Sequence, residues 1–217
     1  KYDKVLLSIV DSLINDYRFR IREVEKRMKI IAQAAKLPGE TTKEEIREQR
    51  NELDMMERTL EPTLTTLFSL GYKEIKGDDY IKRIQPLLKE SHEKFDNAVR
   101  EAILELISDF KLSGFDISDA LSSMIVSAKL DSGIAQQFQD ARQELDSLNF
   151  AIAEIVDLSY SIERAEFSEH ITTAMAEQHD KFDQLVIRAI YALIQDYRAK
   201  NQAIVLGMEP VINAAKL

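Results

Sequence analysis

The residues best suited to bind a metal ion are Glu163, Glu166 and His170. If they lie in a helix, their spacing of three and then four places them on one face. Carboxylates and imidazoles are ligands for divalent metals, but one helix face supplies too few of them, and a second helix would have to contribute. The sequence has no Glu-x-x-His pair of the kind that holds di-iron centres in helical bundles. The three residues are therefore weak metal candidates, and we expect no metal and no cofactor.

Another polar set recurs along the chain as Asp16, Asp109 and Asp196, each followed by an aromatic and then a basic residue. Helical residues two positions apart point in different directions, so each Asp and its basic neighbour do not pair with one another. We expect interhelical ion pairs or solvated edges rather than ligand contacts. His92 and His179 hold equivalent positions in two copies of a repeated sequence, and we expect them at a helix surface or interface.

One stretch of this acidic chain is locally basic. It contains Arg18, Arg20, Arg22, Lys26 and Arg27. The plain interpretation is a solvated helix face that pairs with acidic neighbours. The alternative is an interaction surface for an acidic partner protein.

Catalytic motifs are missing from the sequence. It has no Cys, no Gly-rich phosphate loop and no nucleophile elbow, and its Ser and Thr residues follow no recognisable triad order. The net charge of −9 argues against a phosphate-binding surface, and therefore against nucleic acid as a partner. We expect a protein that is not an enzyme.

The composition predicts an all-α fold. Of 217 residues, 45% are hydrophobic and 31% are charged, whereas Gly and Pro number only 6 and 4. This bias favours long helices over sheets and turns. We predict an elongated helical bundle of long antiparallel helices.

Three stretches are near copies of one another. Residues 92–110 and 179–197 are identical at 10 of 19 positions, and residues 1–18 match 181–198 at 7 of 18. A second element repeats as well, because Arg-x-Glu-Leu-Asp at 50–54 recurs at 142–146. Agreement at polar positions favours duplication over convergence of amphipathic helices.

The repeats predict two tandem three-helix units, residues 1–93 and 94–180, with 181–217 as a closing helix or the start of a third unit. One continuous bundle is the alternative.

Apolar spacing and turn signals predict helices over residues 2–36, 43–70 and 79–112. Thr42 and Glu45 have the capping-box spacing, and Pro62 predicts a kink or restart. Gly114 predicts a helix end, with a short helix after it. The Gly- and Pro-free stretch from residue 134 to 206 predicts a break near residues 167–169.

The first functional hypothesis is the extracytoplasmic sensor domain of a bacterial transmembrane receptor. Residues 145–167, LDSLNFAIAEIVDLSYSIERAEF, resemble the long helices of sensor domains in bacterial chemoreceptors and histidine kinases. The resemblance contains no specific motif, so it implies no ligand residue. The start at Lys1 without Met favours an excised or processed fragment, and the resemblance implies the periplasmic or extracellular side of a membrane.

The alternative hypothesis is a structural or scaffolding fragment that resembles spectrin-like helical repeats, in which one helix runs on into the next unit. The absence of Trp departs from the usual spectrin pattern. A cytoplasmic location would fit this alternative. Under either hypothesis the partner is a protein or a small ligand, with a homodimer as one option, and a membrane is met only through segments that flank this chain.

Overall fold

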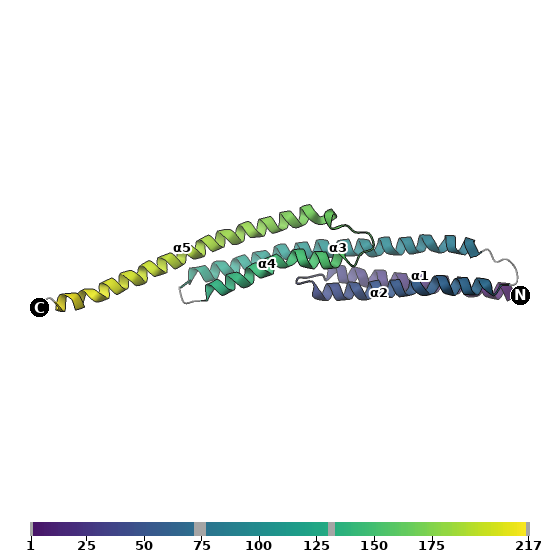
Figure 1. The fold of residues 1–217 in the computed structure, drawn as a ribbon, viewed down its shortest axis with the longest axis horizontal. Coiled ribbons are helices and arrows are strands. Elements are labelled where there is room, and N and C mark those ends of the chain that lie inside the picture. The colour runs from purple at the N-terminus through teal and green to yellow at the C-terminus, as the bar shows by residue number, and fades with distance from the viewer. Residues whose placement is uncertain (1, 72–76, 130–132, 216–217) are drawn as a thin grey trace. The chain divides into compact units, whose positions relative to one another are not determined.

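The computed structural model describes residues 2–71, 77–129 and 133–215. In these ranges the chain is all-α, as predicted, and contains no strand (Figure 1). The elements are α1 (Tyr2–Gln33), α2 (Glu40–Ser69), α3 (Gly77–Val126), α4 (Ile134–Val156), the 3₁₀ turn η1 (Arg164–Phe167) and α5 (Ser168–Ala214). None of the described helices combines the length and the apolar character that crossing a membrane requires.

Contacts divide the chain into two compact units. Unit 1 contains residues 1–107 and 149–168, and unit 2 contains residues 108–148 and 169–217. Helices α3 and α4 supply residues to both units. A unit of contacts differs from a unit of sequence repetition, so the division into repeats at residues 93 and 180 stays a prediction.

In unit 1, α1 and α2 pack against each other along their length. Apolar side chains recur on α1 at steps of three or four, which turns one stripe of the helix toward α2. Gly39 joins the two helices with a φ of 85°, a left-handed conformation that a side chain would strain. The buried residues of α1 are Leu6, Val10, Ile14, Tyr17, Ile21, Val24, Met28, Ile31 and Ala32.

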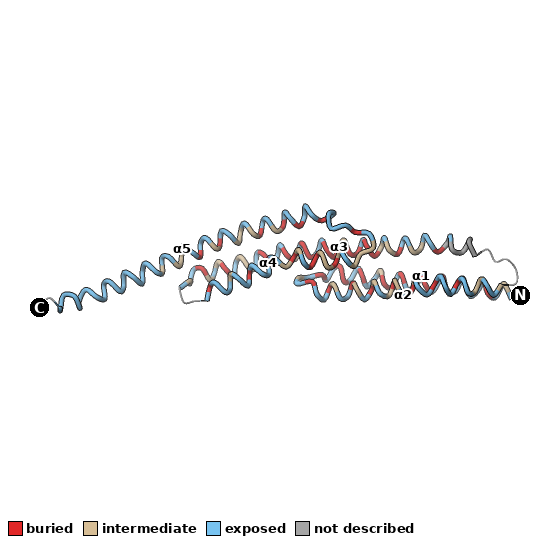
Figure 2. Tube along the Cα trace, viewed as in Figure 1, coloured by how far each residue is buried: buried red, intermediate tan, exposed pale blue. Residues whose placement is uncertain are grey.

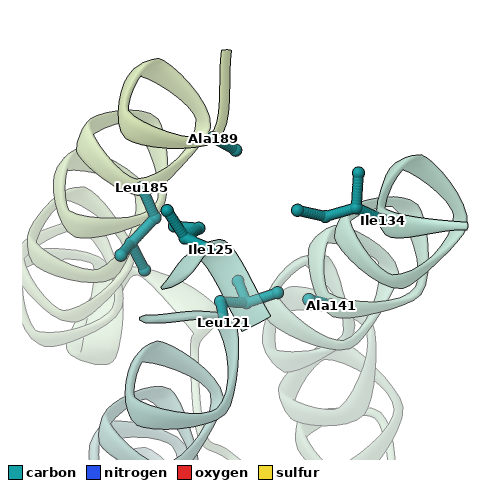
Figure 3. Close-up of a cluster of buried hydrophobic side chains, with 6 residues drawn as sticks. All are labelled: Leu121, Ile125, Ile134, Ala141, Leu185 and Ala189. Carbon is teal, nitrogen blue, oxygen red and sulfur yellow. The ribbon is translucent and has the colours of Figure 1, made fainter. Parts of the chain in front are cut away.

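Unit 2 has its own hydrophobic core. Side chains from α3, α4 and α5 converge in it, as Figure 3 shows. Partly buried aromatic and aliphatic side chains, among them Phe138 and Phe182, pack around this core. Its buried members are Leu121, Ile125, Ile134, Ala141, Leu185 and Ala189.

Several predicted boundaries are wrong. Helix α2 begins at Glu40 after Gly39, so Thr42 lies inside the helix and is buried rather than capping it. Pro62 lies within α2, which runs through it without a restart. Helix α3 also runs through Gly114 to Val126, and the close approach of Gln178 to this position leaves no room for a side chain there.

The expected break after residue 134 is present but begins earlier. Helix α4 ends at Val156 and the chain returns to a helix only at η1, so the break covers residues 157–163 rather than 167–169. Helix α3 begins at Gly77 rather than at the predicted residue 79, and residues 72–76 and 130–132 lie outside the described residues.

Candidate functional site

The most elaborate polar site of unit 1 surrounds Tyr160, in the turn between α4 and η1. Four side chains from two helices hold this turn: Arg50 and Asp54 of α2, and His92 and Asp96 of α3. We call these four the covered cluster. Each pair is spaced by four residues, so its members lie on one face of their helix.

Asp96 fixes the backbone of the turn. Its Oδ1 accepts a hydrogen bond from the Tyr160 N–H at 2.8 Å, and its Oδ2 accepts two from Ser161, from N–H at 2.9 Å and from Oγ at 2.6 Å. The residue is only 1% exposed. A buried carboxylate needs such donors, because hydrogen bonds replace the water that it loses on burial.

Arg50 holds the other side of the turn. Its guanidinium donates to the carbonyl oxygens of Leu158 and Ser159 at 2.7 and 2.8 Å, and its Nε donates to Asp54 at 3.1 Å. The same guanidinium lies 3.4 Å from the centroid of the Tyr160 ring. Cation–π attraction therefore adds to the hydrogen bonds.

The Tyr160 side chain lies between ionisable groups. Its ring stacks on the His92 ring with centroids 3.7 Å apart, and its hydroxyl donates to Asp54 Oδ1 at 2.8 Å. His92 Nε2 in turn lies 2.5 Å from Glu57 Oε1. Phe95 contacts the tyrosine ring edge-on.

Burial, together with the hydrogen bond that the hydroxyl donates to Asp54, strongly raises the pKa of Tyr160. The hydroxyl therefore stays protonated at neutral pH and serves as a donor. We read this arrangement as a site for binding a chain turn, because each group of the cluster is engaged by the turn or by another cluster member.

Unit 2 repeats the same residue types at the same spacing. Arg142 and Asp146 lie on α4, and His179 and Asp183 lie on α5. Two helices again bring them together, since His179 Nε2 lies 3.4 Å from Asp146 Oδ1. We call these four the open cluster.

The two clusters differ in exposure. The side chains of Arg50 and Asp54 are 24% and 29% exposed, whereas those of Arg142 and Asp146 are 75% and 53% exposed. Asp96 is buried, but Asp183 is exposed. The covered cluster thus has a turn over it and the open cluster is accessible to solvent.

The metal candidates do not come together. Glu166 pairs with Arg100, with an oxygen–Nε distance of 3.0 Å, and this contact lowers the pKa of its carboxyl group. The Glu163 side chain caps η1, and His170 is exposed on α5. The expected continuous helix face is absent, because the chain is 3₁₀ rather than α-helical at 164–167. Within the described ranges, no three potential metal ligands are grouped.

The basic patch lies along α1, and all five of its residues are exposed. Arg20 pairs with Asp16 at 3.2 Å, and Lys26 pairs with Glu23 at 2.7 Å. Arg27 lies 3.6 Å from Glu52 of α2. Arg18 and Arg22 line a hollow of about 290 Å³ together with Ile21, Leu87, Glu90, Ser91 and Lys94.

The recurring Asp residues find partners within their own helices. Asp16 pairs with Arg20 and Asp196 with Lys200, each four positions further on. The exposed pair of Asp16 and Arg20 fits the expected solvated edge, with side chains that are 60% and 50% exposed. The helical i,i+4 geometry offers a nearer cation in each case.

Sequence reasoning noted the repeated Arg, Asp and His residues but missed Tyr160. A signal was present, because Leu70-Gly71-Tyr72 repeats the pattern of Leu158-Ser159-Tyr160, in each case close after the Arg-x-Glu-Leu-Asp helix. Tyr72 itself falls outside the described residues.

Comparisons with known proteins assign no family to this chain. No protein-family model matches its sequence. No curated protein and no solved structure matches it either.

Proposed function

We propose that the chain is a non-enzymatic module from an array of helical repeats, which acts as a scaffold through contacts between units and with partner proteins. The observation that supports this proposal most strongly is the exposure of the third copy of the repeated helix, on α5. One face of this copy packs in the core of unit 2 through Leu185 and Ala189, whereas a second apolar face is accessible where the equivalent face of the second copy, on α3, is buried (Figure 2).

The exposure of three residues in the second copy can be compared with that of the equivalent residues in the third copy. In the second copy, Ile103, Ile107 and Phe110 are 0%, 5% and 1% exposed. In the third copy, Ile190, Ile194 and Tyr197 are 51%, 40% and 59% exposed. A repeat array explains the difference, since each unit covers its apolar face with helices of a neighbour and a terminal copy lacks that neighbour.

The coding sequence on both sides of residues 1–217 separates this proposal from the sensor hypothesis. An array predicts further copies of the helix that begins with Lys-Phe-Asp at 181–183. A sensor predicts an apolar span of about 20 residues on each side. Flanks with two such spans and no further copy would contradict the array.

A chain extended in register tests the proposal in solution. Residues 111–217 are joined after Tyr197, so that a second α4 and a second α5 follow the third copy at the repeat offset. We expect amides of residues 185–197 to exchange hydrogen more slowly than in the original chain, because the new helices bury this stretch.

The matched control starts the added segment at residue 113 instead. Omitting two residues turns the following helix by about 200° and points its apolar face elsewhere. Equal exchange at residues 185–197 in the original, in-register and out-of-register chains would refute the proposal.

The sensor hypothesis remains a second candidate, and the hollow on α1 and α3 supports it. Arg18 and Arg22 offer this hollow two guanidinium groups suited to a small anion, while its Lys94 pairs with Glu90 and Glu25. Thermal-shift measurements with small carboxylic acids and amino acids test the idea, and Arg22→Ala should remove any stabilisation. No shift with any compound would count against a sensor.

A further inference from the structure

We infer that the open cluster of unit 2 is a docking site for a helix and turn of a further repeat of this type. The docking segment would be the equivalent of residues 149–168 and would carry the tyrosine that corresponds to Tyr160. This inference rests on the proposed repeat array, and it names the residues that would join one unit to the next. The four residues of the open cluster are not among the side chains that form the core of unit 2.

The covered cluster defines what such a ligand must carry. Its turn offers two backbone N–H groups and a serine hydroxyl to Asp96, and two carbonyl oxygens to Arg50. Its tyrosine offers a hydroxyl to Asp54 and a ring face to His92. The required ligand therefore carries a Tyr-Ser turn whose contacting groups, backbone and side chain, are all uncharged.

The open cluster presents the same groups in the same order. Asp183 follows His179 by four residues on α5, as Asp96 follows His92 on α3. Arg142 and Asp146 match Arg50 and Asp54 on the partner helix.

Among the described residues, the open cluster makes fewer hydrogen bonds than the covered cluster. His179 Nε2 is shielded from solvent and has no hydrogen-bond partner among the described residues. The Arg142 Nε lies 3.9 Å from Asp146, compared with 3.1 Å in the covered pair. Arg142, Asp146 and Asp183 are exposed, so a ligand can reach their side chains and add the contacts that the covered cluster makes.

The apolar surface beside the cluster supports a helix as the rest of the ligand. In unit 1 the turn follows the end of α4, whose Ala151, Ile152 and Ile155 are buried. In unit 2, the third copy exposes Ile190 and Ile194 on the same helix as His179 and Asp183. A helix ending in a Tyr-Ser turn would cover both the apolar and the polar part.

The test uses the full chain and a fluorescein-labelled peptide with the sequence of residues 149–168, with binding followed by fluorescence anisotropy. We expect saturable binding that weakens at least about tenfold for the chain variant Asp183→Ala and for the peptide variant Tyr160→Ala, since each loses hydrogen bonds of the turn. Glu144→Ala is the matched control, because it removes an exposed carboxylate of α4 outside the cluster.

The outcomes separate this inference from the proposed array. Absence of peptide binding, or binding that Asp183→Ala leaves unchanged, overturns the docking site. If the in-register extended chain nevertheless protects residues 185–197, the array proposal stands without it. Failure of that extended chain removes the array, whatever the peptide does.

Discussion

Asp96 is a carboxylate with almost no exposure to solvent, and it accepts three hydrogen bonds from two adjacent residues of one turn. We predict that Asp96→Ala lowers the free energy of unfolding by about 2–4 kcal/mol, because it leaves buried donors without partners. Chemical denaturation measures the loss.

Asp183→Ala is the control for that substitution, since it changes the equivalent but exposed residue of unit 2. Its effect should stay within about 0.5 kcal/mol. Equal losses for the two variants would show that the hydrogen bonds of the turn do not stabilise unit 1.

Tyr17 of α1 makes the stability of unit 1 depend on pH in the alkaline range. Burial, with a further contribution from the negative charge of Glu57, raises the pKa of Tyr17 to about 12. The folded protein therefore keeps the phenol proton between about pH 10 and 12, whereas the unfolded chain loses it above about pH 10. The stability from Tyr17 is fully present below pH 10 and declines as the pH rises toward 12.

Between pH 8 and pH 11 the free energy of unfolding should fall in both proteins. We predict that it falls by about 1 kcal/mol less in the Tyr17→Phe variant than in the unsubstituted chain. Chemical denaturation at the two pH values gives the comparison. Other groups that titrate in this range, such as lysines, contribute equally to both proteins. Parallel losses would show that the phenol is not buried in its neutral form.

At the scale of helices, Gly114 shows how packing overrides a local signal. A Cβ at this position would lie 2.3 Å from Gln178 Oε1, and Gln178 is only 1% exposed. Gly207 is also helical, but none of the described atoms lies within 4 Å of the place its Cβ would take.

Alanine at the two positions should therefore act in opposite directions. Gly207→Ala should stabilise the protein by about 0.5–1 kcal/mol, since it only reduces backbone freedom. Gly114→Ala should destabilise it by about 1 kcal/mol or more, because overpacking outweighs the same gain. Thermal unfolding compares the two variants, and stabilisation by both would mean that Gln178 moves aside without cost.

The difference between local sequence signals and tertiary packing also explains which elements could be predicted from the sequence. Regular spacing of apolar residues predicted α1 and most of α2, because that stripe alone determines the buried face. The helix end predicted at Gly114 is wrong, because the glycine at this position allows α3 to approach α5 closely and does not end the helix. The break after Val156 has no Gly or Pro to announce it.

The candidate site was predicted only in part for a related reason. The repeated polar residues Arg50, Asp54 and His92 stood out by comparison of the copies. The role of Tyr160 depends on bonds to residues 64 and 106 positions earlier, Asp96 and Asp54. Such long-range pairs leave no periodic pattern in one sequence.

At the scale of the whole molecule, the C-terminal part of α5 adds surface without adding core. Every described residue from 201 to 215 is exposed. We predict that deletion of residues 201–217 changes the free energy of unfolding by less than about 0.5 kcal/mol. Leu185→Ala, in the core of unit 2, should cost about 2–5 kcal/mol.

Thermal and chemical unfolding of the two variants provides the measurement. A large loss on deletion would show that residues 201–217 stabilise the chain in a way that their exposure does not reveal.

The position of Tyr160 in the chain also sets an order of events during synthesis. Asp54, His92 and Asp96 all precede this residue, and the N-terminal helices leave the ribosome first. The residues that hold the turn have therefore left the ribosome before the turn itself emerges. Unit 1 stays incomplete on the ribosome until residues 157–163 have been translated and have left the exit tunnel.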